Sequence, residues 1–383
     1  MTVREKLRKI GFYALSVILV ASAVTCTAIR IIGAGLSFSP ELLAVESTLP
    51  AVNYNFGEVK KDSPPAKENV QVLSEERNKS EPPEDEKYKS EDVSGRETAA
   101  FECSMPTDEE LAEYDKSHDG EEKYPVLEFT SVQGNMSYDG VQVKNSSSFA
   151  LNIKEELEGK IGFSVDDTDE PQVLIYHTHT CEGFLDYDMG YYYESFYPRT
   201  KDKSRNVCAI GEEITKQLNS MGIKTIHDTT YHDDPSYSGA YYRSTDTVNS
   251  YLKKYPSIKV VLDIHRDGIG TDNSRSKPVF TVNGKKAAQM MILAGYNYEG
   301  IDEFADWEYN LRFALQIQKK AQQMYPDMVR PLNFGDFVYN EDINTGSLLI
   351  EVGADSNTVE EVRYTGHLLG QVLGKVLEDN KNK

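Results

Sequence analysis

The sequence predicts an α/β domain with a largely parallel sheet flanked by helices on both faces, preceded by a transmembrane helix and a disordered linker. Three observations support this prediction. An uncharged apolar run lies near the N-terminus, an acidic stretch follows it, and beyond residue 124 short apolar runs alternate with amphipathic helical patterns. Such alternation is typical of right-handed crossovers in a mostly parallel sheet. The predicted boundaries are 1–38 for the membrane segment, 39–123 for the linker and 124–383 for the globular domain.

The segment from Ile10 to Ile29 carries no charge and is long enough for a helix spanning roughly 30 Å of hydrocarbon. Basic residues between positions 4 and 9 precede it, so the positive-inside rule keeps the N-terminus in the cytoplasm and places the domain outside the cell membrane. We therefore expect a single-pass anchor with an extracytoplasmic domain. A cleaved signal peptide is the alternative, because Ala21, Ala23 and Ala28 supply small residues near the end of the run.

Residues 39–123 are rich in Glu, Lys, Ser and Pro and poor in aromatic residues. Such a stretch buries too little apolar surface to offset its ordering entropy, so we expect a disordered tether. The net charge of −21 argues against nucleic acid as a ligand. Four scattered cysteines do not make a disulfide framework. For Cys181 and Cys208 the sequence leaves open either a bridge or two free buried thiols.

The globular part divides into strands and helices in chain order. Its apolar runs predict strands at 173–176, 223–228, 259–264, 290–296 and 347–353. Three- and four-residue apolar spacing predicts helices at 206–222, 244–254, 302–324 and 358–377. Asn283 and Gly284 form the strongest hairpin signal in the chain.

Histidine and carboxylate side chains follow three of these strands. His177, His179 and Glu182 come after the first strand, His265 after the third, and Glu351 lies at the last. The carboxyl ends of strands in an open α/β sheet form the crevice where ligands bind. Two imidazoles and one carboxylate are a familiar zinc set that leaves a position for water, and a second carboxylate can take the proton of that water.

The two histidines of the first group have a simpler alternative as hydrogen-bonded residues at a polar strand end. Two observations favour a functional interpretation. His177 and His179 occur together with Glu182, and residues two apart in an extended chain point to the same face. The other histidines are predicted to be structural; they are His118, His227, His232 and His367.

His265 and Glu351 have alternatives of different strength. His265 lies close to Asp263 and Arg266, so a salt-bridged imidazole explains it equally well in isolation. Glu351 follows a buried apolar run, where an unpaired carboxylate would cost several kcal/mol or shift its pKa strongly. Glu351 is therefore predicted to have a partner, a metal or a role in proton transfer.

Three motifs together resemble the stage II sporulation protein P family of membrane-anchored peptidoglycan hydrolases: "VLIYHTHTCEGF", "SIKVVLDIHRDG" and "GSLLIEVGADSNTVEE". They are more distantly similar to zinc-dependent N-acetylmuramoyl-L-alanine amidases of the amidase-3 type. The resemblance covers roughly residues 124–377. It implies an amidase-3-like fold for the globular domain.

The resemblance also implies a site. It matches His179, with His177 as competitor, and His265 to the two zinc-binding histidines, and it matches Glu351 to the catalytic glutamate. The glutamate ligand is assigned to Glu182, although Glu194 lies at a spacing closer to that of the amidases. Arg266 is predicted to bind a substrate carboxylate or the tetrahedral oxyanion, with a plain salt bridge as the alternative. Zn²⁺ is the expected cofactor, and Mn²⁺ or Fe²⁺ suits the same ligands.

The implied activity is hydrolysis of the amide between N-acetylmuramic acid and L-alanine, with stem-peptide cross-links as a further substrate, during engulfment of the forespore. The implied partners are peptidoglycan, the lytic transglycosylase stage II sporulation protein D and a multipass membrane protein, and the implied location is the space between the mother-cell and forespore membranes. A non-catalytic peptidoglycan-binding scaffold that recruits another hydrolase is the main alternative. Some other metallohydrolase is a third.

Overall fold

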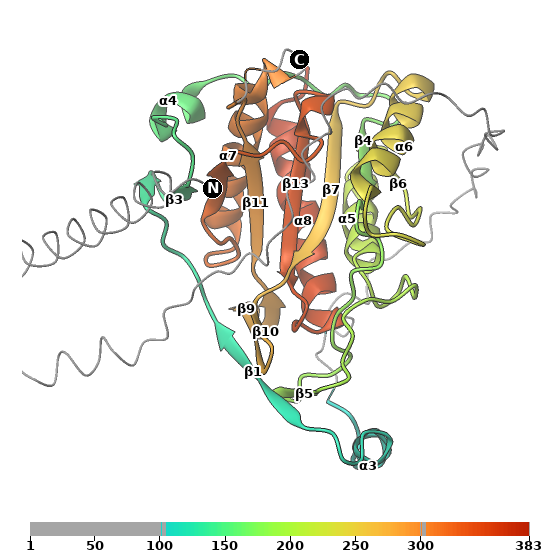
Figure 1. The fold of residues 1–383 in the computed structure, drawn as a ribbon. Coiled ribbons are helices and arrows are strands. Elements are labelled where there is room, and N and C mark those ends of the chain that lie inside the picture. The colour runs from blue at the N-terminus through green and yellow to red at the C-terminus, as the bar shows by residue number, and fades with distance from the viewer. Residues whose placement is uncertain (1–100, 102–104, 299, 301–303, 383) are drawn as a thin grey trace, which may run out of the picture. The chain divides into compact units, whose positions relative to one another are not determined.

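The computed structural model of the chain describes residues 101, 105–298, 300 and 304–382 (Figure 1). The predicted anchor at 10–29 and most of the predicted linker lie outside these residues. Within the described part, no helix is both long enough and apolar enough to cross a bilayer.

The centre of the domain is a sheet of eight strands. They are β2 (Met136–Tyr138), β3 (Val141–Asn145), β4 (Val173–Tyr176), β6 (Thr225–His227), β7 (Val260–Asp267), β11 (Met290–Gly295), β12 (Leu332–Gly335) and β13 (Ser347–Ala354). Their order is β2-β3-β12-β11-β13-β7-β4-β6. The strands β13, β7, β4 and β6 are parallel neighbours, as predicted. However, β11 is antiparallel to β13 and β2 is antiparallel to β3, so the sheet is mixed.

Helices cover both faces of this sheet, as the alternation of elements predicts. The helices are α4 (Ile153–Glu158), α5 (Cys208–Ser220), α6 (Ala240–Lys254), α7 (Trp307–Met324) and α8 (Val359–Asp379), with a short 3₁₀ helix η2 (Glu341–Ile343). Side chains of α5, α7 and α8 join one large core cluster, and Val248 of α6 packs in a separate one. The two clusters take alternate residues of β4, because successive side chains of a strand point to opposite faces.

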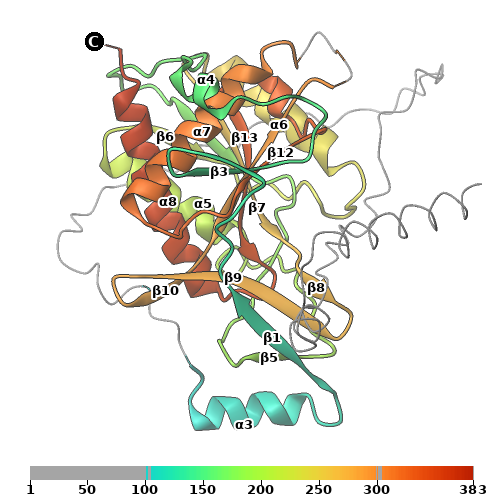
Figure 2. The same cartoon turned by 90° about the vertical axis from the view of Figure 1, so that its left-hand side faces the viewer.

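A smaller sheet lies at one end of the domain (Figure 2). It consists of β1 (Lys123–Phe129), β5 (Tyr191–Tyr193), β8 (Gly270–Thr271), β9 (Ser274–Val282) and β10 (Lys285–Ala288), with β10-β9-β1-β5 as the main order. The predicted hairpin joins β9 to β10. Asn283 and Gly284 have φ angles of 51° and 75°, as a two-residue turn with positive φ at both positions requires.

The predicted linker contains a helix that the sequence interpretation missed, α3 (Asp108–Ser117). Thr107 and Glu110 form a reciprocal capping box at its start. Past its end, the ring of His118 stacks on Tyr193 of β5, with 4.3 Å between the ring centroids. Residues 108–117 therefore differ from the predicted disordered tether, because local capping and aromatic packing offset the ordering entropy.

Candidate active site

Three parallel neighbours, β4, β7 and β13, bring the predicted residues to one edge of the central sheet. His265 lies in β7 and is the direct Cα partner of Glu351 in β13. His179 and Glu182 lie in the turn that follows β4, which itself pairs with β7. The prediction that separate strand ends deliver these side chains to one rim agrees with this arrangement.

The turn after β4 is held by its own threonines. The main-chain N–H of Thr178 donates to Asp263 Oδ1 at 2.8 Å, and its hydroxyl donates to Oδ2 at 2.6 Å. The hydroxyl of Thr180 donates to the carbonyl of His177 at 2.9 Å. The bond of Thr180 is local and closes a turn, whereas the bonds of Thr178 tie this turn to Asp263 in β7. Such side-chain bonds compete with the continuation of a strand, which agrees with the end of β4 at Tyr176.

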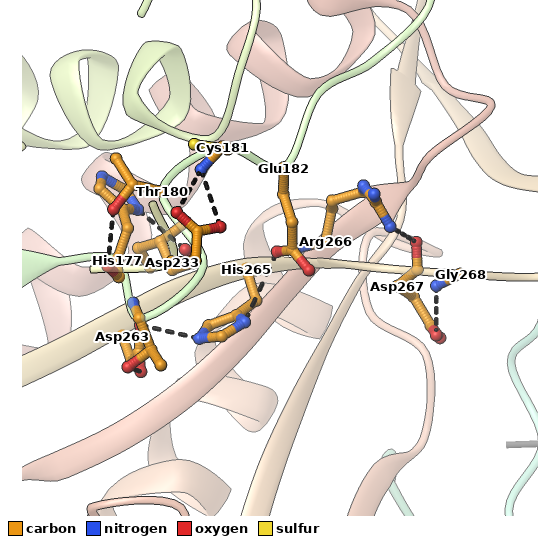
Figure 3. Close-up of polar contacts among 12 residues, drawn as sticks. His177, Thr180, Cys181, Glu182, Asp233, Asp263, His265, Arg266, Asp267 and Gly268 are labelled. Atoms are coloured by element: carbon orange, nitrogen blue, oxygen red, sulfur yellow. Dashed lines mark hydrogen bonds and ion pairs between the residues drawn. The ribbon is translucent and has the colours of Figure 1, made fainter. Parts of the chain in front are cut away.

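His179, Glu182 and His265 are all buried, and His265 lies beside each of the other two. Glu182 Oε2 lies 3.5 Å from Nδ1 of His265, and Figure 3 shows these two side chains pointing toward each other. The rings of His179 and His265 are 5.3 Å apart between centroids and nearly perpendicular. Nδ1 of His179 is buried without a hydrogen-bond partner. Two imidazoles and one carboxylate thus lie close together, and Nε2 of His265 also lacks a hydrogen-bond partner.

Asp263 lies behind His265 on the side away from Glu182. His265 Nε2 lies 2.8 Å from Asp263 Oδ1, close enough for an ion pair, although its direction is not that of a hydrogen bond. Burial opposes the charged ring, but Asp263 and Glu182 outweigh it and raise the pKa of His265 to about 10. The salt-bridged imidazole considered for His265 is therefore present, and its carboxylate stands where the outer partner of a metal-bound histidine stands in metalloproteins.

The carboxyl of Glu351 is poorly satisfied. The residue as a whole is half-buried, but its Oε2 is closed off from solvent and has no hydrogen-bond partner. Burial, reinforced by Asp267 and Glu182, raises the pKa of Glu351 to about 8, although His265 opposes the shift. A carboxyl whose pKa lies near neutrality suits transfer of a proton in either direction.

His177 and Glu194 do not join this group. His177 is hydrogen-bonded through Nδ1 to the carbonyl of Ile264 at 2.8 Å, and its Nε2 faces His227 Nε2 at 2.8 Å. The expectation that His177 and His179 point to the same face is wrong, because the chain is no longer extended after β4. Glu194 is exposed just after β5. Of the two candidate glutamates, it is therefore Glu182 that lies at the site.

Arg266 holds the loop that follows Glu182. Its main-chain N–H donates to Glu182 Oε2 at 3.2 Å. Its guanidinium donates to the carbonyls of Gly183 at 3.2 Å, Pro198 at 2.9 Å and Asp267 at 3.2 Å. The first bond holds the Glu182 side chain, and the guanidinium bonds hold the main chain around it. The role of Arg266 toward substrate or oxyanion stays a prediction.

Two tyrosines near the site were not predicted from the sequence. The ring of Tyr237 stacks on His179, with 4.1 Å between centroids and 9° between planes, although 59% of its surface is exposed. Tyr241, near the start of α6, lies 6.4 Å from the ring of His265 and 5.5 Å from Tyr339. No periodic pattern marks such contacts, since they form between a loop and a distant strand end.

The donor types at this edge fit a zinc ion, since imidazole nitrogen and carboxylate oxygen are its common ligands and His179 offers an unpartnered nitrogen. Within the described residues, two groups have all ligand atoms within 4.8 Å of one another, and His179, Glu182 and His265 do not form one of them. Glu128, Asp188 and Glu361 already surround a cation, the ammonium of Lys277. The remaining group is His177, Cys208 and His227.

Cys181 and Cys208 are both buried and free, so they form no bridge with each other.

Fold and site together define an α/β protein with buried histidines and carboxylates at the carboxyl edge of parallel strands. The chain belongs to the stage II sporulation protein P family: the model of the family described as "Stage II sporulation protein P (SpoIIP)" matches residues 43–374. The chain is 25% identical over 222 residues to Stage II sporulation protein P of Bacillus subtilis (strain 168). That match covers 55% of this chain and 52% of the relative, so the chain spans about half the length of the curated relative it matches.

Several solved amidase structures show a weaker likeness. N-acetylmuramoyl-L-alanine amidase AmiC2 of Nostoc punctiforme is 12% identical, with 55% of this chain and 96% of that one covered and a TM-score of 0.31. The CwlD amidase from Clostridioides difficile, solved in complex with the GerS lipoprotein, is 16% identical, with 54% and 99% covered and a TM-score of 0.30.

Proposed function

We propose that this protein is a metal-dependent peptidoglycan hydrolase that cleaves the amide between N-acetylmuramic acid and L-alanine. One observation carries the proposal. His179, Glu182, His265 and Glu351 come from three parallel strand ends and meet at one edge, with unsatisfied atoms on His179 and Glu351. If the residues at this edge had only a structural role, each buried polar atom without a partner would cost about 1–3 kcal/mol of stability.

The metal ligands in this proposal are His179, Glu182 and His265. Bound Zn²⁺ would polarise the scissile carbonyl and lower the pKa of water toward neutrality. Asp263 orients the His265 ring through its contact with Nε2. The Arg266 main-chain N–H steadies the carboxylate of Glu182.

Glu351 is the proton carrier. Its carboxylate accepts a proton from the attacking water and passes it to the leaving amine. The raised pKa of this carboxyl makes both transfers feasible near neutral pH. Tyr237 stacks over His179 and shields one side of the site from solvent, which strengthens electrostatic interactions inside it.

Family membership supports the choice of substrate and setting. In this proposal the protein acts on the wall during forespore engulfment, anchored in the membrane with its domain outside the cytoplasm. It works with the transglycosylase stage II sporulation protein D and a multipass membrane partner. Cleavage of stem-peptide cross-links is a second activity of the same site.

The test uses the purified full chain with isolated sacculi, with and without chelator. Glu351→Gln removes the proton carrier and keeps the side-chain size, and Glu194→Gln is the matched control because that residue is exposed. We expect peptide-free glycans from the metal-replete protein and from the control, and a loss of about 10²–10⁴ in rate for Glu351→Gln. Sacculi that bind the metal-replete protein but release nothing would contradict the proposal and favour a scaffold.

A further inference from the structure

We infer that His177, Cys208 and His227 form a second metal site, separate from the proposed catalytic one, that binds Zn²⁺ through two imidazoles and a thiolate. The donors come from three elements: His177 follows β4, Cys208 opens α5, and His227 ends β6. Their ligand atoms all lie within 4.8 Å of one another. This inference stands independently of the proposed hydrolytic function.

The hydrogen bonds fix which nitrogens can bind a metal. A carbonyl oxygen only accepts, so Nδ1 of His177 carries the proton that it shares with the carbonyl of Ile264. Nε2 of His177 is therefore unprotonated, and the proton between the two facing Nε2 atoms belongs to His227. Nδ1 bound to a main-chain carbonyl, with Nε2 left free, is the usual arrangement of a metal-binding histidine.

Binding of the metal needs only two proton movements. The proton on His227 Nε2 moves to Nδ1, which faces Glu212 Oε2 at 3.8 Å and gains a carboxylate partner of the kind found beside metal-bound histidines. The thiol of Cys208 loses its proton to solvent, as a coordinating thiol does. The product is a neutral pair of imidazoles and one thiolate around a dication.

Helix α5 carries a glycine where it packs against the two imidazoles. A Cβ added to Gly211 would collide with His227 Nε2 and would lie 3.0 Å from His177 Nε2, so glycine is what lets the helix come this close to both nitrogens. Gly211, which has no side chain, therefore lies opposite the two nitrogens. A cavity of about 470 Å³ is lined by Cys208, His227 and Glu212 among others, and it gives an ion a path to two of the three donors.

The donor chemistry selects the ion. A thiolate disfavours Mg²⁺ and Ca²⁺, which prefer oxygen ligands, whereas two imidazoles and a thiolate suit Zn²⁺ with a water as fourth ligand. The metal would join the end of β4, the start of α5 and the end of β6. Because His179 and Glu182 lie in the turn directly after His177, the second ion would fix the position of the proposed catalytic turn.

The test is the near-ultraviolet charge-transfer absorption between thiolate and cobalt in the Co²⁺-loaded full chain. It is made in a background in which Cys26 and Cys103 are replaced by Ser, so that only Cys181 and Cys208 remain. Cys208→Ser removes the proposed ligand, and Cys181→Ser is the matched control because its thiol is also buried and free. We expect the band in the background protein and in Cys181→Ser, its loss in Cys208→Ser, and one bound metal fewer per chain in Cys208→Ser.

A background protein without the band, or a band that persists in Cys208→Ser, would overturn the inference. X-ray absorption of the zinc-loaded full chain needs no variant, and a zinc shell without sulfur would overturn it as well. Failure of the hydrolytic proposal is distinguishable, because Glu351→Gln keeps the thiolate band whatever its effect on sacculi.

Discussion

Replacing Glu351 with glutamine should stabilise the metal-free protein increasingly as pH rises. In the folded protein burial raises the pKa of this carboxyl from 4.5 to about 8. Between these two pH values the folded state holds a proton that the unfolded chain has lost, so the free energy of unfolding of the wild type falls as pH increases. Above about pH 8 both states are ionised and the loss is complete. Glutamine has no proton to lose and should not show this fall.

The magnitude follows from the same two values. At about 1.4 kcal/mol for each pH unit, an increase from 4.5 to about 8 corresponds to roughly 5 kcal/mol. Because the residue is half-buried and solvent screens part of the effect, we expect about 2–4 kcal/mol. Bound zinc would reduce this difference, since a nearby cation favours the ionised carboxylate.

The assay is urea unfolding of the full chain in excess chelator at pH 5, 7 and 9. The assay compares the free energy of unfolding of Glu351→Gln with that of the wild type at each pH. Other titrating groups contribute equally to both proteins, so their contributions cancel in the difference. The same difference for Glu194→Gln, an exposed carboxylate, should stay nearly constant. If the difference for Glu351→Gln did not grow between pH 5 and pH 9, the assignment of an unsatisfied buried carboxyl would be refuted.

Three further substitutions test the outer parts of the site and the fold. Asp263→Asn removes the charge beside His265 and should weaken zinc binding about 10–100-fold, which competition with a chromophoric chelator would measure; an unchanged Kd would argue against the orienting role. Lys277→Met leaves Glu361 buried without its cation and should cost about 3–5 kcal/mol in urea unfolding, and an equally stable variant would contradict this. Gly284→Ala places a side chain at φ 75° and should cost about 1 kcal/mol in thermal unfolding with unchanged hydrolysis, whereas lost activity would show that the hairpin contributes to the site.

The part of the fold that positions the site could be predicted because its strands are strongly apolar. The runs before His177, His265 and Glu351 are buried on both faces, as central parallel strands require. The direction of β11 could not be predicted, since a strand buried at every position looks the same in either orientation. The missed strand β12 has only four residues. The capping box of α3, in contrast, was visible in the sequence as Thr107 followed by Glu110.

The sequence predicted which residue types form the site and which strand ends carry them. It did not predict the direction in which each side chain points. The paired histidines after β4 suggested one shared face, but the threonine bonds of the turn send His177 toward His227 and leave His179 with His265. Contacts of this kind depend on how the loops fold in three dimensions. The spacing of apolar residues in the sequence carries no information about this. The same reason explains why Tyr237 was overlooked.

The place of β1 in the small sheet has a mechanical consequence. The chain enters the globular domain through α3 and then β1, and β1 is hydrogen-bonded to β5 on one side and to β9 on the other. The register sets these contacts in series, because β5 pairs with residues 123–125 and β9 pairs with residues 126–129. A pulling force that arrives from the N-terminal side must therefore break the β5 contacts before it loads the β9 contacts. If the protein acts as proposed, tension between its N-terminal segment and a stiff polymer would open the β5 contacts first, and the parallel pairing of β1 with β9 would hold until then.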